Sequence, residues 1–164
     1  MAERDESSDR QAIYEVMLRY CRGIDRLDMD LVRSAYHPDG IDHHTGFDGP
    51  VEDYLVWVEE GLRRLGGTMH MLAKHSVELR GGRAVAETYG QAVHWPRSPG
   101  PSFITGFRYA DELAYRDGRW AIAQRWAIRE WAHTAEPATL PGASGPVGRR
   151  DADDPLYLAL ARLS

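Results

Sequence analysis

The N-terminal part of the chain repeats apolar residues at steps of three and four, which is the spacing of one helix face. The first repeat begins near Asp9, and its apolar positions are Ile13, Val16, Met17, Tyr20, Ile24 and Leu27. Asp28 or Asp30 is placed to cap a second, short helix that runs through Tyr36. The pattern therefore predicts two consecutive helices.

A loop and a third helix are predicted next. The loop is punctuated by Pro38, Gly40, Gly46 and Gly49, and it holds Asp42, His43 and His44. Pro50 suits the first turn of the third helix, and Gly66-Gly67 is expected to end it. The apolar positions of this helix are Tyr54, Trp57, Val58, Leu62 and Leu65.

After residue 67 the pattern changes to long runs that are typical of strands. The predicted strands are residues 68–80, 83–96, 102–116 and 119–133. Gly81-Gly82 and Asp117-Gly118 are hairpin signals, and a Pro/Gly/Ser segment joins the two middle strands. Long strands that meet at tight turns predict a twisted, mainly antiparallel sheet.

The last predicted strand is apolar on both faces. One face carries Trp120, Ile122, Trp126 and Ile128, and the other carries Ala121, Ala123, Ala127 and Trp131. Because the helices cover only one face of the sheet, we expect a second subunit to cover the other. The expected assembly is a homodimer or a homotrimer.

Helices followed by strands, without βαβ alternation, predict an α+β architecture. The 164 residues suffice for one domain, which we place at residues 9–135. Residues 1–8 are polar and are expected to be flexible. Residues 136–164 are expected to be a loose extension, in which Leu156–Leu163 forms a short helical turn that docks on the body or on a neighbouring subunit.

Composition and charge exclude several classes of protein. The net charge of −5 is spread along the chain and no basic stripe is present, so we expect no nucleic-acid partner. No apolar run approaches the length of a membrane span, and the charged N-terminus does not resemble a signal peptide. A single cysteine, Cys21, rules out an internal disulfide and a multi-cysteine zinc site. The expected location is cytoplasmic.

Asp25 and His70 are the first candidates for chemistry. Asp25 lies at the C-terminal end of the first predicted helix, beside its apolar face, where the helix dipole disfavours a carboxylate. His70 opens the first predicted strand. A carboxylate bonded to one imidazole nitrogen would leave the other nitrogen as a base. A solvated carboxylate and a structural histidine are the alternative interpretation of the same positions.

Arg125 is a third candidate, because a buried arginine in an apolar strand requires a carboxylate or an anionic ligand. A surface position on a half-exposed strand explains it equally well. Asp42, His43 and His44 form a possible metal triad, but adjacent residues point in different directions, so at most two could bind one ion. We therefore expect no metal and no cofactor. The chain also lacks a Gly-x-Ser-x-Gly elbow.

Several short motifs together resemble the SnoaL-like family of the nuclear-transport-factor-2-like superfamily. They are the run from Tyr20 to Asp28, Tyr36-His37-Pro38-Asp39, Thr68-x-His70, Val77-x-Leu79-x-Gly81-Gly82-x-Ala84 and the run from Asp117 to Arg125. Members with this pattern include a lindane dehydrochlorinase, a bile-acid dehydratase and scytalone dehydratase. The resemblance spans roughly residues 9–133 and implies a cone-shaped α+β barrel with an apolar pocket between the helices and a strongly curved sheet.

The resemblance also assigns roles. Asp25 and His70 match the family's His–Asp dyad, Tyr20 matches a tyrosine near the leaving hydroxyl, and Arg125 matches a recurrent arginine of the final strand. Lys74 departs from the family, which often carries Asn there, and it would add a cation if it faced the pocket. The other expected pocket residues are Asp42, His44, Phe47, Trp57, His94, Phe107 and Trp126.

The leading hypothesis is a cofactor-independent lyase of the dehydratase type, or an isomerase, that acts on a small hydrophobic molecule such as a steroid, polyketide or terpenoid. His70 would be the general base and Asp25 its orienter, while Tyr20 and Arg125 assist. Three alternatives remain open at this stage: a non-catalytic binding or assembly domain, a hydrolase or cyclase of the same superfamily, and a metal-dependent enzyme that uses His43 and His44.

Overall fold

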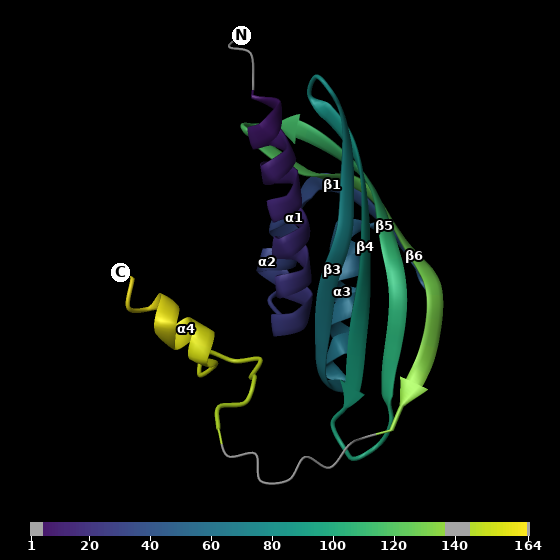
Figure 1. Cartoon of the computed structure of the whole chain (residues 1–164), viewed down its shortest axis with the longest axis vertical. Helices are drawn as coiled ribbons and strands as arrows, with labels where there is room; N and C mark the ends of the chain where they lie inside the picture. The colour runs from purple at the N-terminus through teal and green to yellow at the C-terminus, as the bar shows by residue number, and fades with distance from the viewer. Residues whose placement is uncertain (1–4, 137–144, 164) are drawn as a thin grey trace.

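Three helices of the body pack on one side of a curved sheet in the computed structural model (Figure 1). The model describes residues 5–136 and 145–163, so the predictions made for residues 1–4, 137–144 and 164 lie outside it. The helices are α1 (Glu6–Arg26), α2 (Met29–Ser34), α3 (Val51–Arg63) and α4 (Pro155–Leu160). None of the helices in the described part is long and apolar enough to cross a membrane.

The sheet has six strands within the described residues. They are β1 (Tyr36–His44), β2 (Phe47–Pro50), β3 (Leu65–Arg80), β4 (Arg83–Pro96), β5 (Ser102–Arg116) and β6 (Arg119–Ala135). Their order is β2-β1-β6-β5-β4-β3, and every neighbouring pair is antiparallel except β1 and β6, which are parallel. The α+β class with helices against a curved, mainly antiparallel sheet is confirmed.

Helix α1 lies along the concave side of the sheet (Figure 1). Asp5 caps its start by accepting a hydrogen bond from the Ser8 N–H at 2.8 Å. It ends at Leu27, whose φ of 58° lies in the left-handed region. Its buried residues are Ile13, Val16, Met17, Tyr20, Cys21, Gly23 and Ile24. The apolar face therefore carries Tyr20 and Cys21 inward, one turn before Asp25.

The segment between α2 and α3 differs from the prediction. Tyr36 begins strand β1 instead of ending the second helix, and the expected loop of residues 38–49 is a β1–β2 hairpin. Its inner strand pairs with β6, more than 80 residues away along the chain. A helix or loop was predicted because the local pattern holds no sign of so distant a partner.

Gly66 and Gly67 do not end α3, which stops at Arg63. They lie inside β3, where close approach of the neighbouring strand requires glycine. A Cβ atom on Gly67 would lie 2.0 Å from the indole of Trp95, and one on Gly66 would lie 2.5 Å from the carbonyl oxygen of Pro96. The two glycines thus mark a tight strand contact and not a helix cap.

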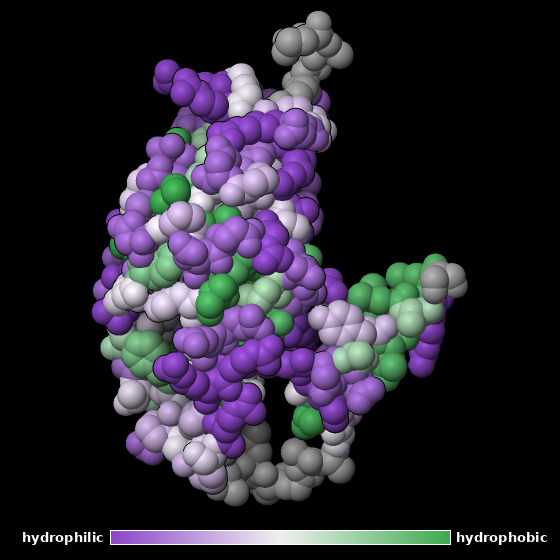
Figure 2. Space-filling view, turned by 180° about the vertical axis from the view of Figure 1, so that it is seen from behind, coloured by the Kyte–Doolittle hydropathy of each residue, from purple (hydrophilic) through white to green (hydrophobic). Residues whose placement is uncertain are grey.

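Helix α4 stands apart from the body (Figure 1). Asp154 caps the start of α4. The leucines of α4 are exposed, so the helix presents a hydrophobic surface beside the more polar surface of the body (Figure 2). The segment before it touches the body through Arg149 and Arg150. The short helix was expected at Leu156–Leu163 and lies at Pro155–Leu160, and the segment that precedes it makes the contacts with the body.

Candidate active site

Two adjoining lobes of a cavity lie between α1, α3 and the inner face of the sheet. One has a volume of about 530 Å³ and the other about 340 Å³, which is the size of small-molecule sites. Both lobes are lined by His44, Trp57, His70 and His94. The larger lobe adds Tyr20, Ile24, Tyr54 and Leu62, and the smaller adds Phe103, Thr105, Phe107 and Tyr109. The cavity is thus mostly apolar, with three imidazoles in its walls.

Asp25 and His70 form a hydrogen-bonded pair at this cavity. Nδ1 of His70 donates to Oδ1 of Asp25 at 2.7 Å, and the backbone N–H of His70 donates to Oδ2 at 2.9 Å. The hydroxyl of Thr68 donates to Oδ1 at 3.1 Å. Nε2 of His70 makes no hydrogen bond within the described residues, so the carboxylate orients the ring and leaves that nitrogen for the cavity.

Tyr20 lies beside the pair and is buried. Its hydroxyl is bonded to the hydroxyl of Tyr54 at 2.5 Å. Burial raises the pKa of Tyr20 well above its ordinary value, so the phenol stays neutral. Tyr20 lines the larger lobe. A hydrogen bond from its hydroxyl to a ligand there would compete with the hydrogen bond to Tyr54.

Arg125 lies behind Tyr20 and is fully buried. It binds Asp111 with both ends of its fork, Nε to Oδ1 at 2.7 Å and Nη2 to Oδ2 at 2.8 Å. Its guanidinium carbon lies 4.1 Å and 3.9 Å from the ring centroids of Tyr20 and Tyr109. Burial alone would lower the pKa of Arg125, but the Asp111 carboxylate outweighs burial and holds the pKa well above its ordinary value. None of its hydrogen bonds reaches Asp25 or His70.

A second carboxylate–imidazole pair enters the cavity from β1. Asp42 has no exposed surface, accepts a hydrogen bond from the Tyr36 hydroxyl at 2.5 Å and is bonded through Oδ1 to Nδ1 of His44. The His44 ring stacks on Tyr54, with centroids 5.0 Å apart and an angle of 22° between planes. His44 thus reaches both lobes, with Asp42 directly behind it.

His94 is the third imidazole of the cavity and lies on β4, with its ring centroid 6.0 Å from that of His70. Burial, followed by the proximity of His70, lowers the pKa of His94 to about 4. Its Nδ1 is buried and has no hydrogen-bond partner among the described residues. His94 is therefore neutral at physiological pH and can donate or accept one hydrogen bond to a ligand.

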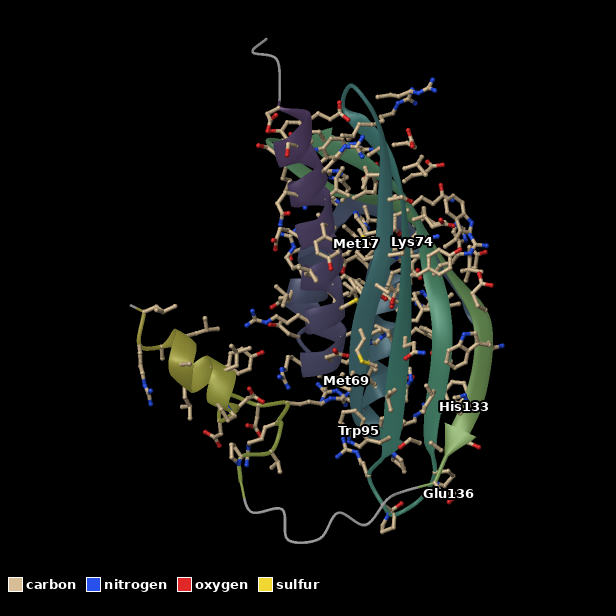
Figure 3. All side chains as sticks on the ribbon, viewed as in Figure 1. Met17, Met69, Lys74, Trp95, His133 and Glu136 are labelled. Carbon is tan, nitrogen blue, oxygen red and sulfur yellow. The ribbon has the colours of Figure 1, made fainter. Side chains whose placement is uncertain are left out.

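Lys74 and Trp126 were expected in the pocket, but the structure places both on the other face of the sheet. An irregularity in β3 between Leu72 and His75 shifts its register, so His75 faces Tyr14 of α1 while Lys74 faces outward over the ring of Tyr89 at 4.3 Å (Figure 3). This placement corrects the expectation of a cation beside the dyad.

A matching irregularity in β6 moves Trp126. Ile122 and Gln124 pair with consecutive residues of β5, so Ala123 is an extra residue that reverses the alternation. Trp126 consequently stacks on His43, at 5.1 Å and 15°, outside the two lobes. The prediction that it shares a face with Ile122 is wrong. Phe47 also lies outside the lobes, behind Tyr54 and Trp57.

His43 points away from Asp42 and His44. Its Nδ1 lies 3.0 Å from Asp48, and its Nε2 lies 2.8 Å from the side-chain amide of Gln124. The three residues of the possible metal triad therefore do not converge. Within the described residues no group of three His, Cys, Asp or Glu side chains is arranged to hold a metal ion.

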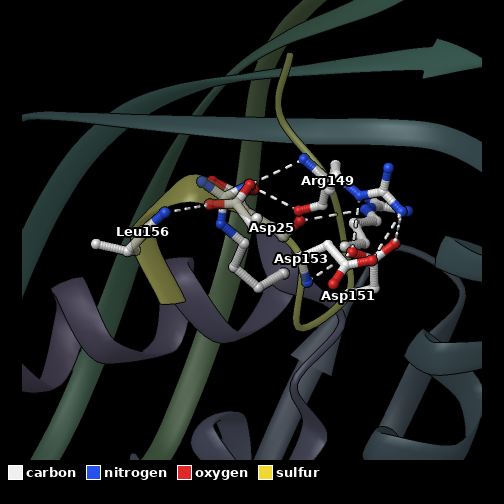
Figure 4. Close-up of polar contacts among 8 residues, drawn as sticks. Asp25, Arg149, Asp151, Asp153 and Leu156 are labelled. Atoms are coloured by element: carbon white, nitrogen blue, oxygen red, sulfur yellow. Dashed lines mark hydrogen bonds and ion pairs between the residues drawn. The ribbon is translucent and has the colours of Figure 1, made fainter. Parts of the chain in front are cut away.

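The segment that precedes α4 lies near Asp25 (Figure 4), and together with Asp25 and His70 it lines a further cavity of about 1000 Å³. Arg150 donates from Nε to the backbone carbonyl of Asp25 at 3.1 Å and from Nη2 to the hydroxyl of Thr68 at 3.1 Å. Its Nη1 donates to the carbonyl of Leu62. Asp154 and Asp151 fix the neighbouring Arg149. A tail residue therefore joins the network that orients the dyad.

Sequence reasoning missed four partners in the site: Thr68, Tyr54, Asp111 and Arg150. Thr68 was available as a signal, because it lies two residues before His70 and shares its face of a strand. Asp111 also had a signal in the sequence, because it is a carboxylate at the strand position between Tyr109 and Leu113, which both face inward from β5. Arg150 had no local signal, since only the folded tail brings it to Asp25.

Comparison with known proteins places the fold. The model of the SnoaL-like domain family matches residues 5–126, and no curated protein matches. A candidate scytalone dehydratase from Novosphingobium aromaticivorans is 19% identical, with a TM-score of 0.71, over 87% of this chain and 95% of that one. The hexachlorocyclohexane dehydrochlorinase LinA-type3 from Novosphingobium barchaimii is 15% identical, with a TM-score of 0.74, over 84% and 97%. Kfla4162 from Kribbella flavida is 21% identical, with a TM-score of 0.73, over 79% and 95%.

Proposed function

The chain belongs to the SnoaL-like domain family, and on that premise we propose that it is a lyase of the dehydratase type, or an isomerase, acting on a small hydrophobic molecule. His70 is the general base, and it removes a proton from a carbon of the substrate. Asp25 fixes the ring so that Nε2 receives that proton. Such acid–base assistance accelerates a reaction about 10²–10⁴-fold.

The observation that carries this proposal is the set of contacts around Asp25. Its two oxygens accept hydrogen bonds from the Thr68 hydroxyl, the His70 N–H and the His70 ring. A carboxylate with three donors holds one orientation, and the imidazole that it holds has its second nitrogen open to an apolar cavity.

The walls of the cavity support a flat, apolar substrate. Phe107 lies 5.8 Å from the His70 ring, centroid to centroid, and Trp57 faces both lobes. Two of the structural relatives are named for eliminating water and hydrogen chloride, which supports an elimination here. Steroid, polyketide and terpenoid compounds all meet the requirement of a flat apolar body, and the proposal extends to that class as a whole.

A substrate-independent test uses 5-nitrobenzisoxazole, which a base opens by removing the ring C–H proton while the N–O bond breaks to give a coloured cyanophenolate. The wild type should accelerate this reaction well above buffer. His70→Gln should remove most of the acceleration, about 10²-fold or more, and Asp25→Asn should lower it about 10-fold. His133→Gln is the matched control, because His133 is exposed near the end of β6 and lies outside the cavity (Figure 3).

Equal rates in the wild type and His70→Gln would refute the proposal. If the probe instead quenches tryptophan fluorescence without turnover in any variant, the domain binds ligands and does not catalyse. Thermal unfolding of each variant is measured alongside, so that a loss of rate is not mistaken for a loss of fold.

The proposal includes a homo-oligomer of two or three chains and a cytoplasmic location. Exposed apolar residues on the sheet support an interface with another copy, and they are Met69, Met71, Val85, Trp95 and Trp131. Light scattering of the purified protein would contradict this part if it gave the mass of a single chain, 18.5 kDa.

A further inference from the structure

The cavity holds two imidazoles that are fixed in the same way. His70 is bonded at Nδ1 to Asp25, and His44 is bonded at Nδ1 to Asp42. Nε2 of His44, like that of His70, makes no hydrogen bond within the described residues, and both rings line both lobes. Each of the two oriented imidazoles therefore presents its Nε2 to the same cavity.

The second pair is also held in place by neighbouring side chains. Asp42 has no exposed surface, its Oδ2 accepts a hydrogen bond from the Tyr36 hydroxyl, and its Oδ1 is bonded to the His44 ring. Tyr54 stacks on one face of the His44 ring, and Trp57 lies 6.3 Å away. When His44 carries protons on both nitrogens, Asp42 accepts the one on Nδ1. The proton on Nε2 is then the one available for transfer into the cavity.

Tyr20 and His94 are poorer proton donors than an imidazole backed by a carboxylate. Burial raises the pKa of Tyr20 far above its ordinary value, and its hydroxyl is already bonded to Tyr54. Burial lowers the pKa of His94 to about 4, so it holds no excess proton at neutral pH. His70 is occupied as the base. His44 is the remaining imidazole with a carboxylate behind it.

We propose that His44, oriented by Asp42, is the general acid of this cavity, and that the leaving group it protonates is a hydroxyl. This inference rests on the proposed function, in which His70 is the base. Hydroxide is a poor leaving group and departs as water only when a proton is supplied, whereas chloride departs as the anion without one. A dedicated acid opposite the base is needed for dehydration and is superfluous for loss of halide.

Removal of the proton by His70 and protonation of the leaving hydroxyl by His44 together conserve atoms and charge. Nε2 of His70 takes a proton from the carbon next to an activating carbonyl, and the C–H electron pair becomes the new C=C bond. The C–O bond breaks, its electron pair stays on oxygen, and that oxygen takes the proton from Nε2 of His44. The products are the alkene and one water molecule. His70 ends protonated and His44 neutral, and exchange with solvent through the open lobes restores both.

Two probes separate the acid from the base. 5-Nitrobenzisoxazole needs only proton removal, because its leaving oxygen is a stable phenolate. 4-Hydroxy-4-phenylbutan-2-one needs proton removal and loss of hydroxyl, and it gives 4-phenylbut-3-en-2-one and water. We expect His44→Gln to lower the rate with the hydroxyketone about 10²-fold or more and to change the benzisoxazole rate less than about 3-fold. His70→Gln should lower both rates.

His43→Gln is the matched control, since His43 is the adjacent histidine and points to Asp48 and Gln124. It should leave both rates unchanged. Asp42→Asn should repeat the pattern of His44→Gln, and its thermal unfolding is measured because Asp42 is buried. If folded His44→Gln lowers the rates with both probes equally, or lowers neither rate, the assignment is overturned. A wild type that opens benzisoxazole but never dehydrates the hydroxyketone also overturns it. A wild type inert to both refutes the proposed function itself.

Discussion

Replacing Asp111 by Asn should destabilise the protein more than any surface substitution. Asp111 and Arg125 have no exposed surface, and the two hydrogen bonds between them are 2.7 Å and 2.8 Å long. An amide in place of the carboxylate leaves the guanidinium charged and buried without an anion. Breaking such a pair costs about 3–5 kcal/mol, because the remaining charge cannot regain its hydration. That loss is a large share of the roughly 5–15 kcal/mol that stabilises a domain.

Urea unfolding at pH 7, followed by tryptophan fluorescence, measures the effect. The control is Asp117→Asn in the exposed β5–β6 turn, where φ is 52° and asparagine is tolerated. We expect a change of less than about 0.5 kcal/mol there. The double variant Asp111→Leu with Arg125→Met should be more stable than Asp111→Leu alone, because it removes the unpaired charge as well. A loss below about 1 kcal/mol for Asp111→Asn would refute the reasoning and imply that Arg125 finds another anion.

Three further predictions follow from the site. His94 has a pKa of about 4 when folded and an ordinary value of 6.5, so the unfolded chain binds more protons between these values. The free energy of unfolding should therefore fall as the pH drops from 6.5 to 4, by about 3 kcal/mol at most. The urea midpoint of His94→Asn should depend less on pH than that of the wild type. Burial raises the pKa of Cys21 to about 12, so at pH 8 iodoacetamide should label the native thiol at least about 100-fold more slowly than the unfolded one; equal labelling rates would contradict this. Thr68→Val removes a donor to Asp25 and should lower kcat for benzisoxazole a few-fold without changing KM, and Thr68→Ser should restore it. No difference between the Val and Ser variants would show that this hydroxyl is not needed.

Local sequence features located Asp25, His70 and most of the sheet. The helix pattern put Asp25 beside the apolar face of α1 and the strand pattern put His70 near the start of β3, and the resemblance to the SnoaL-like family paired the two, which lie in hydrogen-bond contact in the structure. The two hairpin signals and the four long strands were also visible, because glycine turns and apolar runs are local features.

The errors have a common physical cause. A strand alternates its faces with a period of two, and one extra residue reverses every later position. The irregularities near Leu72 and Ala123 did this to Lys74 and Trp126. The sequence has no mark at either place, since a bulge is stabilised by the packing of distant strands. β1 was hidden for a related reason, because besides its short hairpin with β2 it pairs in parallel with β6, which is more than 80 residues away along the chain.

The order of the strands explains why two acid–base pairs face one space. β3 carries His70 at one edge of the sheet, and β1 carries His44 next to the other edge, with β6, β5 and β4 between them. In a flat sheet these strands would be too far apart to share a ligand, since neighbouring strands are separated by about 4.8 Å. Here the sheet curves around the cavity, and α1 and α3 fill the gap between its edges (Figure 1). Curvature thus converts two distant edges into opposite walls, each with a histidine backed by a carboxylate. A base on one wall and an acid on the other is the arrangement that removal of a proton and a hydroxyl from neighbouring carbons requires.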